Sequence, residues 1–286
     1  MKPRLRPETT RAARALTFDV EAINERGEMV PTAIAGEHAL TLYLDKREIV
    51  TLMTMGQAPE ALVLGYLRNQ RLVRSVEEIA AVQVDWETDS AAVTTRKAAR
   101  GADKSLRDKM KKRTVTTGCG QGTMFGDLME DIDRVKLRED VALREDTLYA
   151  LLEQVRQRET IYKTAGAVHG CALATNESGT SRIITFVEDV GRHNAVDTIA
   201  GQMWLEDIDG SDKIFYTTGR LTSEMVIKAA QMQIPFLVSR SGLTQMGYEI
   251  ATKTGITMLG RTTGRHYLLF SGGHRFRKSV APTMFA

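Results

Sequence analysis

The feature that most constrains the fold is a regular alternation of strand-like and helical segments in the second half of the chain. Helical patterns at 193–204, 223–233 and 245–254 separate short apolar runs at 168–175, 181–189, 213–218, 235–241, 256–260 and 266–272. Strands separated by helices are joined by crossover connections, which place parallel strands side by side and cover the sheet with helices. The sequence therefore predicts an α/β fold with a largely parallel sheet, preceded by an amphipathic helix over 144–159.

The first part of the chain has a different pattern and predicts a smaller α+β unit. A hairpin is expected over 39–55, turning at Asp45 and Lys46, followed by a helix over 58–73 and strand-type residues over 80–98. In that helix one face is marked by Leu62, Gly65, Tyr66 and Asn69. A lysine- and arginine-rich segment at 97–113 is either a basic connector or a solvated helix face. We expect two domains, 1–135 and 136–286.

Charge and hydropathy indicate which binding partners and which cellular compartment to expect for this protein. The formal net charge of +3 over 286 residues is too slight to indicate nucleic acid and suits an anionic small ligand equally well. No segment approaches the ~20 apolar residues of a membrane helix, and the arginine-rich start lacks the apolar run of a signal peptide. The expectation is a cytoplasmic protein that binds neither nucleic acid nor membrane.

The chain has only two cysteines, Cys119 and Cys171, 52 positions apart and without CxxC or Cys/His metal spacing. In a reducing compartment this arrangement argues against a structural disulfide. Cys171 lies in an apolar run and predicts buried packing. Cys119 lies between glycines in "VTTGCGQGTMFGDL", where it is either a working thiol or a small residue in a turn.

Polar residues gather where predicted strands lead into helices, at the edge of a parallel sheet where ligands bind. The densest group is "VEDVGRHNAVD" at 187–197, in which a helix start offers unpaired N–H donors. Its candidate ligand residues are Arg192, His193 and Asp197. Capping and ion pairing at one helix start is the alternative interpretation.

Two further junctions carry arginines. In "TTGRLTSE" Arg220 exceeds what helix capping requires, and "GRTTGR" near the C-terminus combines arginines, hydroxyls and glycines. Guanidinium groups pair bidentately with oxyanions and glycine lets a backbone approach closely, so the second motif suits a phosphate or pyrophosphate. A hairpin turn with solvated arginines would look the same. The candidate residues of this motif are Gly260, Arg261, Thr262, Thr263, Gly264 and Arg265.

These junctions resemble those of the formate dehydrogenase accessory sulfurtransferases. The resemblance rests on "VEDVGRHNAVD", "TTGRLTSEMVIKAAQMQIPFLVSRSGLTQMGYEIA" and "LGRTTGRHYLLFSG", with "TAGAVHGCALAT" and "ALTLYLDKREIVTLMTMGQAPEALVLGYL" at the expected places. It covers nearly the whole chain after about residue 20. It implies a small N-terminal domain joined to a domain of cytidine deaminase-like fold, and a homodimer.

The resemblance also implies a function. Family members bind the bis-molybdopterin guanine dinucleotide form of molybdenum cofactor and pass it sulfur from a cysteine desulfurase before it enters the formate dehydrogenase catalytic subunit. The loop cysteine of the family maps onto Cys119, and its cofactor-binding stretch maps onto 260–265. Family members commonly carry CxxC in that loop, whereas Gly122 stands at the second position here. Two functions stay open: sulfur transfer through a Cys119 persulfide, or a chaperone that delivers the cofactor without moving sulfur.

A zinc deaminase is not expected, although the implied fold is deaminase-like. Such enzymes need H-x-E at one helix start and P-C-x-x-C at the next. Here His193 is followed by Asn194 and Ala195, and the next helix start has no cysteine. The sequence therefore predicts no metal ligands and no resident zinc.

Overall fold

The structure is a computed structural model that describes residues 5–99, 132 and 134–279. By spatial contacts the chain divides into two compact units, and neither is continuous in sequence. Unit 1 comprises residues 1–130, 159–171 and 187–208, and unit 2 comprises 131–158, 172–186 and 209–286. The predicted domain boundary between residues 135 and 136 stays a prediction. In spatial terms, a helix from the second half of the sequence belongs with the N-terminal unit.

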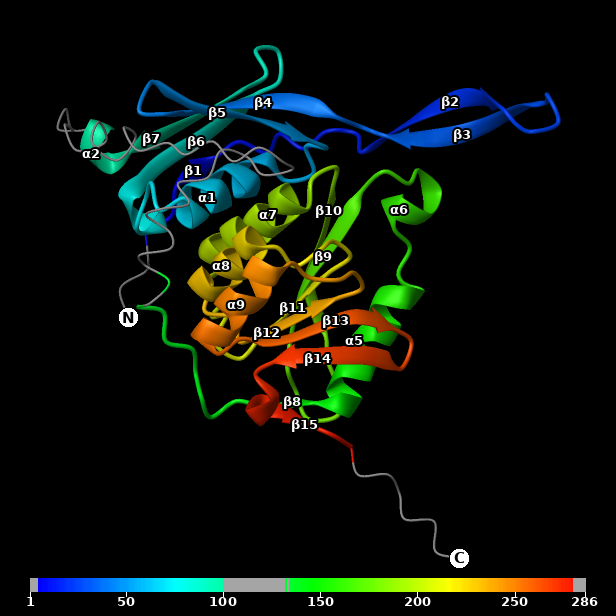
Figure 1. The fold of residues 1–286 in the computed structure, drawn as a ribbon. Coiled ribbons are helices and arrows are strands. Elements are labelled where there is room, and N and C mark those ends of the chain that lie inside the picture. Colours follow the sequence, from blue (N-terminus) through cyan, green and yellow to red (C-terminus); the bar gives the residue numbers. More distant parts are fainter. Residues whose placement is uncertain (1–4, 100–131, 133, 280–286) are drawn as a thin grey trace, which may run out of the picture. The chain divides into compact units, whose positions relative to one another are not determined.

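Unit 1 contains a five-stranded mixed sheet with the strand order β1-β6-β7-β4-β5 (Figure 1). Its strands are β1 (Glu8–Thr9), β4 (His38–Leu44), β5 (Arg47–Thr54), β6 (Ile79–Asp85) and β7 (Ser90–Thr95). Strands β4 and β5 form the predicted hairpin. Its turn residues Asp45 and Lys46 have φ values of 48° and 68°, as expected for a two-residue turn that matches the twist of the strands.

Helix α1 (Pro59–Asn69) packs on this sheet and is buried on nearly every side. Every residue of α1 except Arg68 is buried. The burial is this complete because α7 (Arg192–Glu206) packs against the side of α1 that the sheet leaves uncovered. The predicted helix is therefore confirmed, although it ends at Asn69 rather than at residue 73 and is buried beyond the one face that the sequence marks. The remaining short elements of unit 1 are η1 (Val76–Glu78), α2 (Arg96–Ala99) and α6 (Ile161–Thr164).

Unit 1 also contains a hairpin that the sequence pattern does not predict, formed by β2 (Thr17–Ile23) and β3 (Met29–Ala35). These strands pair antiparallel from Thr17 with Ala35 to Ile23 with Met29 and form a two-stranded sheet of their own. Figure 1 shows the hairpin in blue, extending beyond the ends of β4 and β5. The hairpin exposes apolar side chains, among them Phe18 and Ile34.

The six-stranded sheet of the second half has the order β10-β9-β11-β12-β13-β14. Its strands are β9 (His169–Ala174), β10 (Ile183–Asp189), β11 (Ile214–Thr217), β12 (Phe236–Ser239), β13 (Thr257–Thr263) and β14 (His266–Ser271). Strand β12 pairs in parallel with both β11 and β13, whereas β13 and β14 are antiparallel. The α/β class is confirmed, with a mixed sheet whose last two strands form a hairpin.

Helices cover both faces of this sheet within unit 2. Helix α5 (Glu145–Gln157) lies on one face, where Leu148 and Leu151 join a core with β11 and β12 side chains. Helices α8 (Ser223–Gln231) and α9 (Gln245–Thr254) lie on the other face (Figure 1). The short strands β8 (Leu143–Arg144) and β15 (Phe276–Arg277) pair in parallel, and η2 (Gly273–Arg275) precedes β15. In the described part of the chain no helix is long and apolar enough to cross a membrane.

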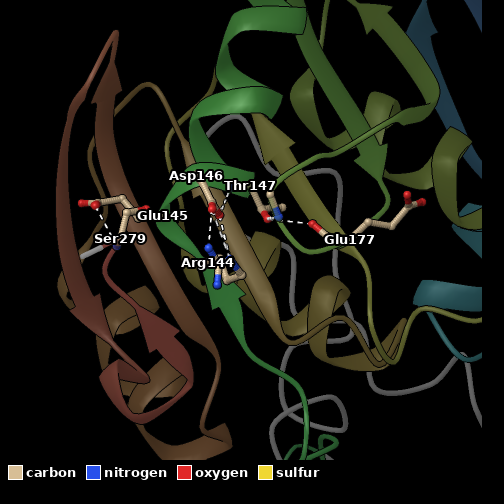
Figure 2. Close-up of polar contacts among 7 residues, drawn as sticks. Arg144, Glu145, Asp146, Thr147, Glu177 and Ser279 are labelled. Atoms are coloured by element: carbon tan, nitrogen blue, oxygen red, sulfur yellow. Dashed lines mark hydrogen bonds and ion pairs between the residues drawn. The ribbon is translucent and has the colours of Figure 1, made fainter. Parts of the chain in front are cut away.

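The start of α5 is tied to two distant segments of unit 2 (Figure 2). The Thr147 hydroxyl donates to the carbonyl oxygen of Glu177 over 2.7 Å and accepts from the Gly179 amide. The Glu145 carboxylate accepts from the backbone N–H of Ser279 over 3.1 Å. These contacts fix the first turn of α5, which contacts the β13–β14 hairpin described below.

Candidate functional site

The residues of "VEDVGRHNAVD" form a buried hydrogen-bond network in unit 1. Asp189, at the end of β10, accepts from the Thr54 hydroxyl over 2.5 Å and from the Met55 amide. Its other oxygen accepts from the Asn194 side chain over 2.9 Å and from the Gly191 amide. Burial raises the pKa of Asp189, and these hydrogen bonds oppose the shift. The network connects the end of β5 to the start of α7.

One turn further along, α7 crosses α1 at two glycines. A Cβ on Gly65 would lie 1.6 Å from the Asp197 carbonyl oxygen, and one on Gly201 would lie 1.8 Å from the Ala61 carbonyl oxygen. No side chain fits at either position, so the two backbones approach directly. The Asn69 amide also donates to the Asp197 carboxylate over 2.7 Å. This crossing explains why α7 belongs to unit 1.

The predicted ligand residues of α7 are therefore largely enclosed. Arg192, His193 and Asp197 are 7%, 2% and 0% exposed. The contact of Asp197 with Asn69 joins two helices, and it is neither capping nor ion pairing at the helix start. The Arg192 Nε is buried and has no hydrogen-bond partner among the described residues, which leaves one donor for a polar group. A ligand role for these three residues stays a prediction.

In unit 2, the loops that follow β11 and β12 are joined by backbone hydrogen bonds to a third segment, the distorted end of β13 with the β13–β14 turn. We call them the carboxyl-edge loops: residues 218–222, 240–244 and 260–265. The Leu221 amide donates to the Gly242 carbonyl oxygen over 3.0 Å, and the Arg261 amide donates to the Ser241 carbonyl oxygen over 2.8 Å. The Ser239 hydroxyl donates to the Gly219 carbonyl oxygen over 2.7 Å. The structure thus brings the loop that carries Arg220 and the "GRTTGR" stretch to one edge of the sheet.

Within "GRTTGR" the local geometry explains why each of the two glycine positions has no side chain. A Cβ on Gly260 would lie 3.0 Å from the Phe270 ring and 3.3 Å from the Ser241 carbonyl oxygen. Gly264, in the β13–β14 turn, has a φ of +59°, in the left-handed region. Arg261 has a φ of 54° where the β13–β14 register is irregular. The strand is distorted here, and the side chains of Arg261, Thr263 and Arg265 are exposed.

The electrostatics of the carboxyl-edge loops suit an anion. Arg220, Arg261 and Arg265 are exposed, and no carboxylate of the described residues lies within salt-bridge distance of them. The hydroxyls of Thr222 and Thr262 are buried and have no hydrogen-bond partner among the described residues. Unpaired buried hydroxyls cost free energy, so they fit a site completed by a polar ligand. These residues fit phosphate oxygens by charge and by donor chemistry.

The sequence analysis missed the residues that hold the β13–β14 turn. Tyr149 and Glu145 on α5 contact Arg265 and Tyr267 respectively. In the sequence they belong to an amphipathic helix far from the motif, and nothing in the residue pattern signals their contact. Only the packing of α5 beside the hairpin reveals it.

Of the two cysteines, only Cys171 lies among the described residues. Cys171 is 0% exposed, and its Sγ lies 4.0 Å from the Arg192 carbonyl oxygen, so the prediction of buried packing is confirmed. Cys119, the predicted sulfur carrier, lies outside the described residues, as does Gly122. Among the described residues there is no group of three or more His, Cys, Asp or Glu side chains that could hold a metal ion.

Comparison with known proteins finds relatives along most of the chain. A protein from Listeria monocytogenes serotype 4b (strain F2365), named sulfur carrier protein FdhD, is 28% identical over 86% of this chain and 92% of its own length. Proteins of the same name from Bacillus subtilis (strain 168) and Wolinella succinogenes are each 26% identical, over 89% and 84% of this chain and 95% and 80% of their own lengths.

A solved structure shares the fold. It is the crystal structure of a protein from Desulfotalea psychrophila, provisionally described as a formate dehydrogenase accessory protein. The two structures superpose with a TM-score of 0.70 over 91% of this chain and 98% of the other, at 24% sequence identity. The model of the FdhD/NarQ family matches residues 35–277. With most of its length matched by that model, the chain belongs to the FdhD/NarQ family.

Proposed function

We propose that this chain is an accessory protein for formate dehydrogenase maturation. It binds the bis-molybdopterin guanine dinucleotide form of molybdenum cofactor as cargo and passes it sulfur from a cysteine desulfurase. The observation that carries the proposal is the set of carboxyl-edge loops, which carry exposed arginines and buried hydroxyls that have, respectively, no carboxylate and no hydrogen-bond partner among the described residues. The names of the relatives, sulfur carrier proteins, support the sulfur step.

In this proposal unit 2 supplies the phosphate contacts. Arg220, Arg261 and Arg265 donate to the anionic oxygens of the guanine dinucleotide, because guanidinium groups form paired hydrogen bonds with phosphate. At Gly264 nothing lies within 4 Å of the place a Cβ would take, so the backbone is open to a ligand there, whereas Gly260 packs against Phe270. For unit 1, considered by itself, Arg192, His193 and Asp197 are proposed as ligand residues. The proposed assembly is a cytoplasmic homodimer of deaminase-like subunits that delivers to the formate dehydrogenase catalytic subunit.

Sulfur transfer falls to Cys119, because Cys171 is fully buried. The Cys119 thiolate attacks the outer sulfur of the desulfurase persulfide. A new S–S bond forms on Cys119 while the donor S–S bond breaks, and the donor cysteine leaves as a thiolate. This exchange needs no added electrons. Delivery of the outer sulfur at the sulfide level needs two electrons, which a cellular dithiol supplies.

A chaperone without sulfur transfer is the second candidate, and Gly122 in place of a second loop cysteine favours it. A single thiol leaves the persulfide without a neighbouring cysteine to resolve or protect it. Both candidates share the same cofactor-binding surface in unit 2.

Calorimetry with GDP, a fragment of the cargo, tests the shared part. We expect wild type to bind GDP, and Arg261→Ala or Arg265→Ala to weaken binding roughly tenfold or more, as loss of a charged hydrogen bond does. Arg156→Ala is the matched control, because Arg156 is an exposed arginine of unit 2 that pairs with Glu153. If wild type binds neither GDP nor the full cofactor, the proposed function is wrong.

The variant Cys119→Ala separates the two candidates. If Cys119 carries sulfur, the variant binds GDP like wild type but does not restore formate dehydrogenase activity in cells that lack the protein. Wild type incubated with a desulfurase and cysteine then gains about 32 Da, and thiol reductants remove the added mass. Full complementation by Cys119→Ala would instead establish the chaperone function.

A further inference from the structure

We propose that Tyr149 and Glu145 of helix α5 are positioning residues for Arg265, holding the β13–β14 turn so that the guanidinium is presented to an anionic group of the ligand. The inference rests on the proposed function of this turn. It adds two residues from an element that carries none of the sequence motifs.

Tyr149 contacts Arg265 in two ways. The Arg265 guanidinium carbon lies 5.6 Å from the centroid of the Tyr149 ring, within the range of a cation–π contact. The Tyr149 hydroxyl lies 3.2 Å from the Arg265 carbonyl oxygen, to which it donates. One side chain therefore holds both the backbone of the turn and the charged group at its tip.

Glu145 fixes Tyr149 and the strand after the turn. Its Oε1 accepts from the Tyr267 hydroxyl over 2.6 Å and lies 3.3 Å from the Tyr149 hydroxyl. Its Oε2 accepts from the Ser279 amide (Figure 2). The Tyr267 ring also meets the Phe276 ring edge-on, with 5.3 Å between centroids. The carboxylate thus joins α5, β14 and the segment after β15, and the single proton of the Tyr149 hydroxyl is shared between Glu145 Oε1 and the Arg265 carbonyl oxygen.

The arrangement leaves Arg265 held but unpaired. Its guanidinium contacts the Tyr149 ring, its side chain is exposed, and no carboxylate of the described residues lies within salt-bridge distance. A contact with the ring leaves the N–H groups at the edge of the guanidinium available for oxyanions. An arginine that is already held loses less conformational freedom on binding, which raises affinity. A solvated turn would need neither the ring nor the carbonyl contact.

A double-mutant cycle tests the inference, with GDP affinity measured by calorimetry and folding checked by thermal denaturation. Tyr149→Leu removes both contacts and is expected to weaken GDP binding about three- to tenfold. Tyr149→Phe keeps the ring and is expected to lose about twofold. In an Arg265→Ala background both losses disappear, because Tyr149 acts only through Arg265. Tyr248→Leu, at an exposed tyrosine of α9, is the control and leaves affinity unchanged.

Each other outcome has a definite meaning. If Tyr149→Leu lowers GDP affinity equally with and without Arg265, Tyr149 contributes independently of Arg265 and the inference is wrong. It is also wrong if a folded Tyr149→Leu binds like wild type while Arg265→Ala does not, and the proposed function then survives. If Tyr149→Leu does not fold, the Tyr149→Phe cycle decides by the same criterion. If wild type fails to bind GDP, the proposed function and this inference fall together.

Discussion

The α1–α7 crossing of unit 1 and the carboxyl-edge loops of unit 2 both contain residues that the sequence singles out, yet their surroundings are opposite. At the crossing, Asp197 is 0% exposed and accepts from Asn69. In the loops, Arg261 and Arg265 are exposed and have no carboxylate partner among the described residues. The comparison teaches that a dense polar motif at a helix start can be an internal scaffold, whereas a sparser motif at a turn can leave its charged groups exposed to solvent.

The physical difference lies in whether the central polar groups of each region have partners, with the Arg192 Nε as the exception in unit 1. Asp189 accepts from four donors that come from β5 and from the start of α7. The hydroxyls of Thr222 and Thr262 have no partner in the described part of the chain. A satisfied buried group stabilises a fold, and an unsatisfied one fits a site completed from outside. Substitutions in the two regions should therefore separate stability from binding.

The largest expected effect is on stability, from Gly201→Ala. Alanine favours a helix over glycine by about 1 kcal/mol, so helix propensity alone predicts stabilisation. The added Cβ would lie 1.8 Å from the Ala61 carbonyl oxygen, which forces α1 and α7 apart. We expect a loss of about 3–5 kcal/mol in the free energy of unfolding, measured by chemical denaturation.

Gly273→Ala is the control for this change. A Cβ there would make only one contact, 3.6 Å from the Leu269 side chain, and its φ is not in the left-handed region. Stability should then change by less than about 0.5 kcal/mol. A stable Gly201→Ala variant would show that the two helices are not held at this distance.

A smaller loss is expected from Asp189→Ala, about 3 kcal/mol, because the change leaves several donors without an acceptor. Among these donors are the Thr54 hydroxyl and the Gly191 amide. Thermal and chemical denaturation measure the effect. Asp140→Ala, at an exposed carboxylate paired with Arg138, is the control and should change stability little. Equal stability of the two variants would contradict the scaffold role of the Asp189 network.

Much of the fold follows from local pattern. The β4–β5 turn is predictable because Asp45 and Lys46 separate two strand-like runs by two residues. The helices and strands of the second half follow from periodicity, as do the loops that carry Arg220 and Arg261. These features depend on residues close together in sequence.

Other features depend on contacts between distant segments. Gly65 is on the helix face that the sequence marks, together with Asn69, but nothing in the sequence indicates that this face meets Asp197 and Gly201. The β2–β3 hairpin was not predicted although β2 alternates apolar and polar residues, since β3 contains Pro31, which argues against a strand, and much of the apolar surface is exposed. The contact of Tyr149 with Arg265 requires the packing of α5 beside β14. Sequence patterns therefore identify the ligand-binding candidates but not the residues that support them.

The smallest expected effect concerns Glu145, which accepts hydrogen bonds beside the β13–β14 turn of unit 2. Hydrogen bonds hold the pKa of the Glu145 carboxyl below its usual value, and the bond from the Tyr267 hydroxyl has the largest effect. A carboxylate with a lowered folded-state pKa contributes stability above its unfolded pKa of about 4.3 and loses it as the pH falls through the folded value. The stability advantage of wild type over Glu145→Gln should thus be constant near neutral pH and disappear in acid, as measured by chemical denaturation across the pH range.

In a Tyr267→Phe background the advantage should be smaller, because the hydrogen bond that lowers the pKa of Glu145 most is absent. An advantage that stays the same from neutral to acid pH would show that Glu145 acts through its shape alone, and the region around Arg265 would then be held by packing rather than by charge.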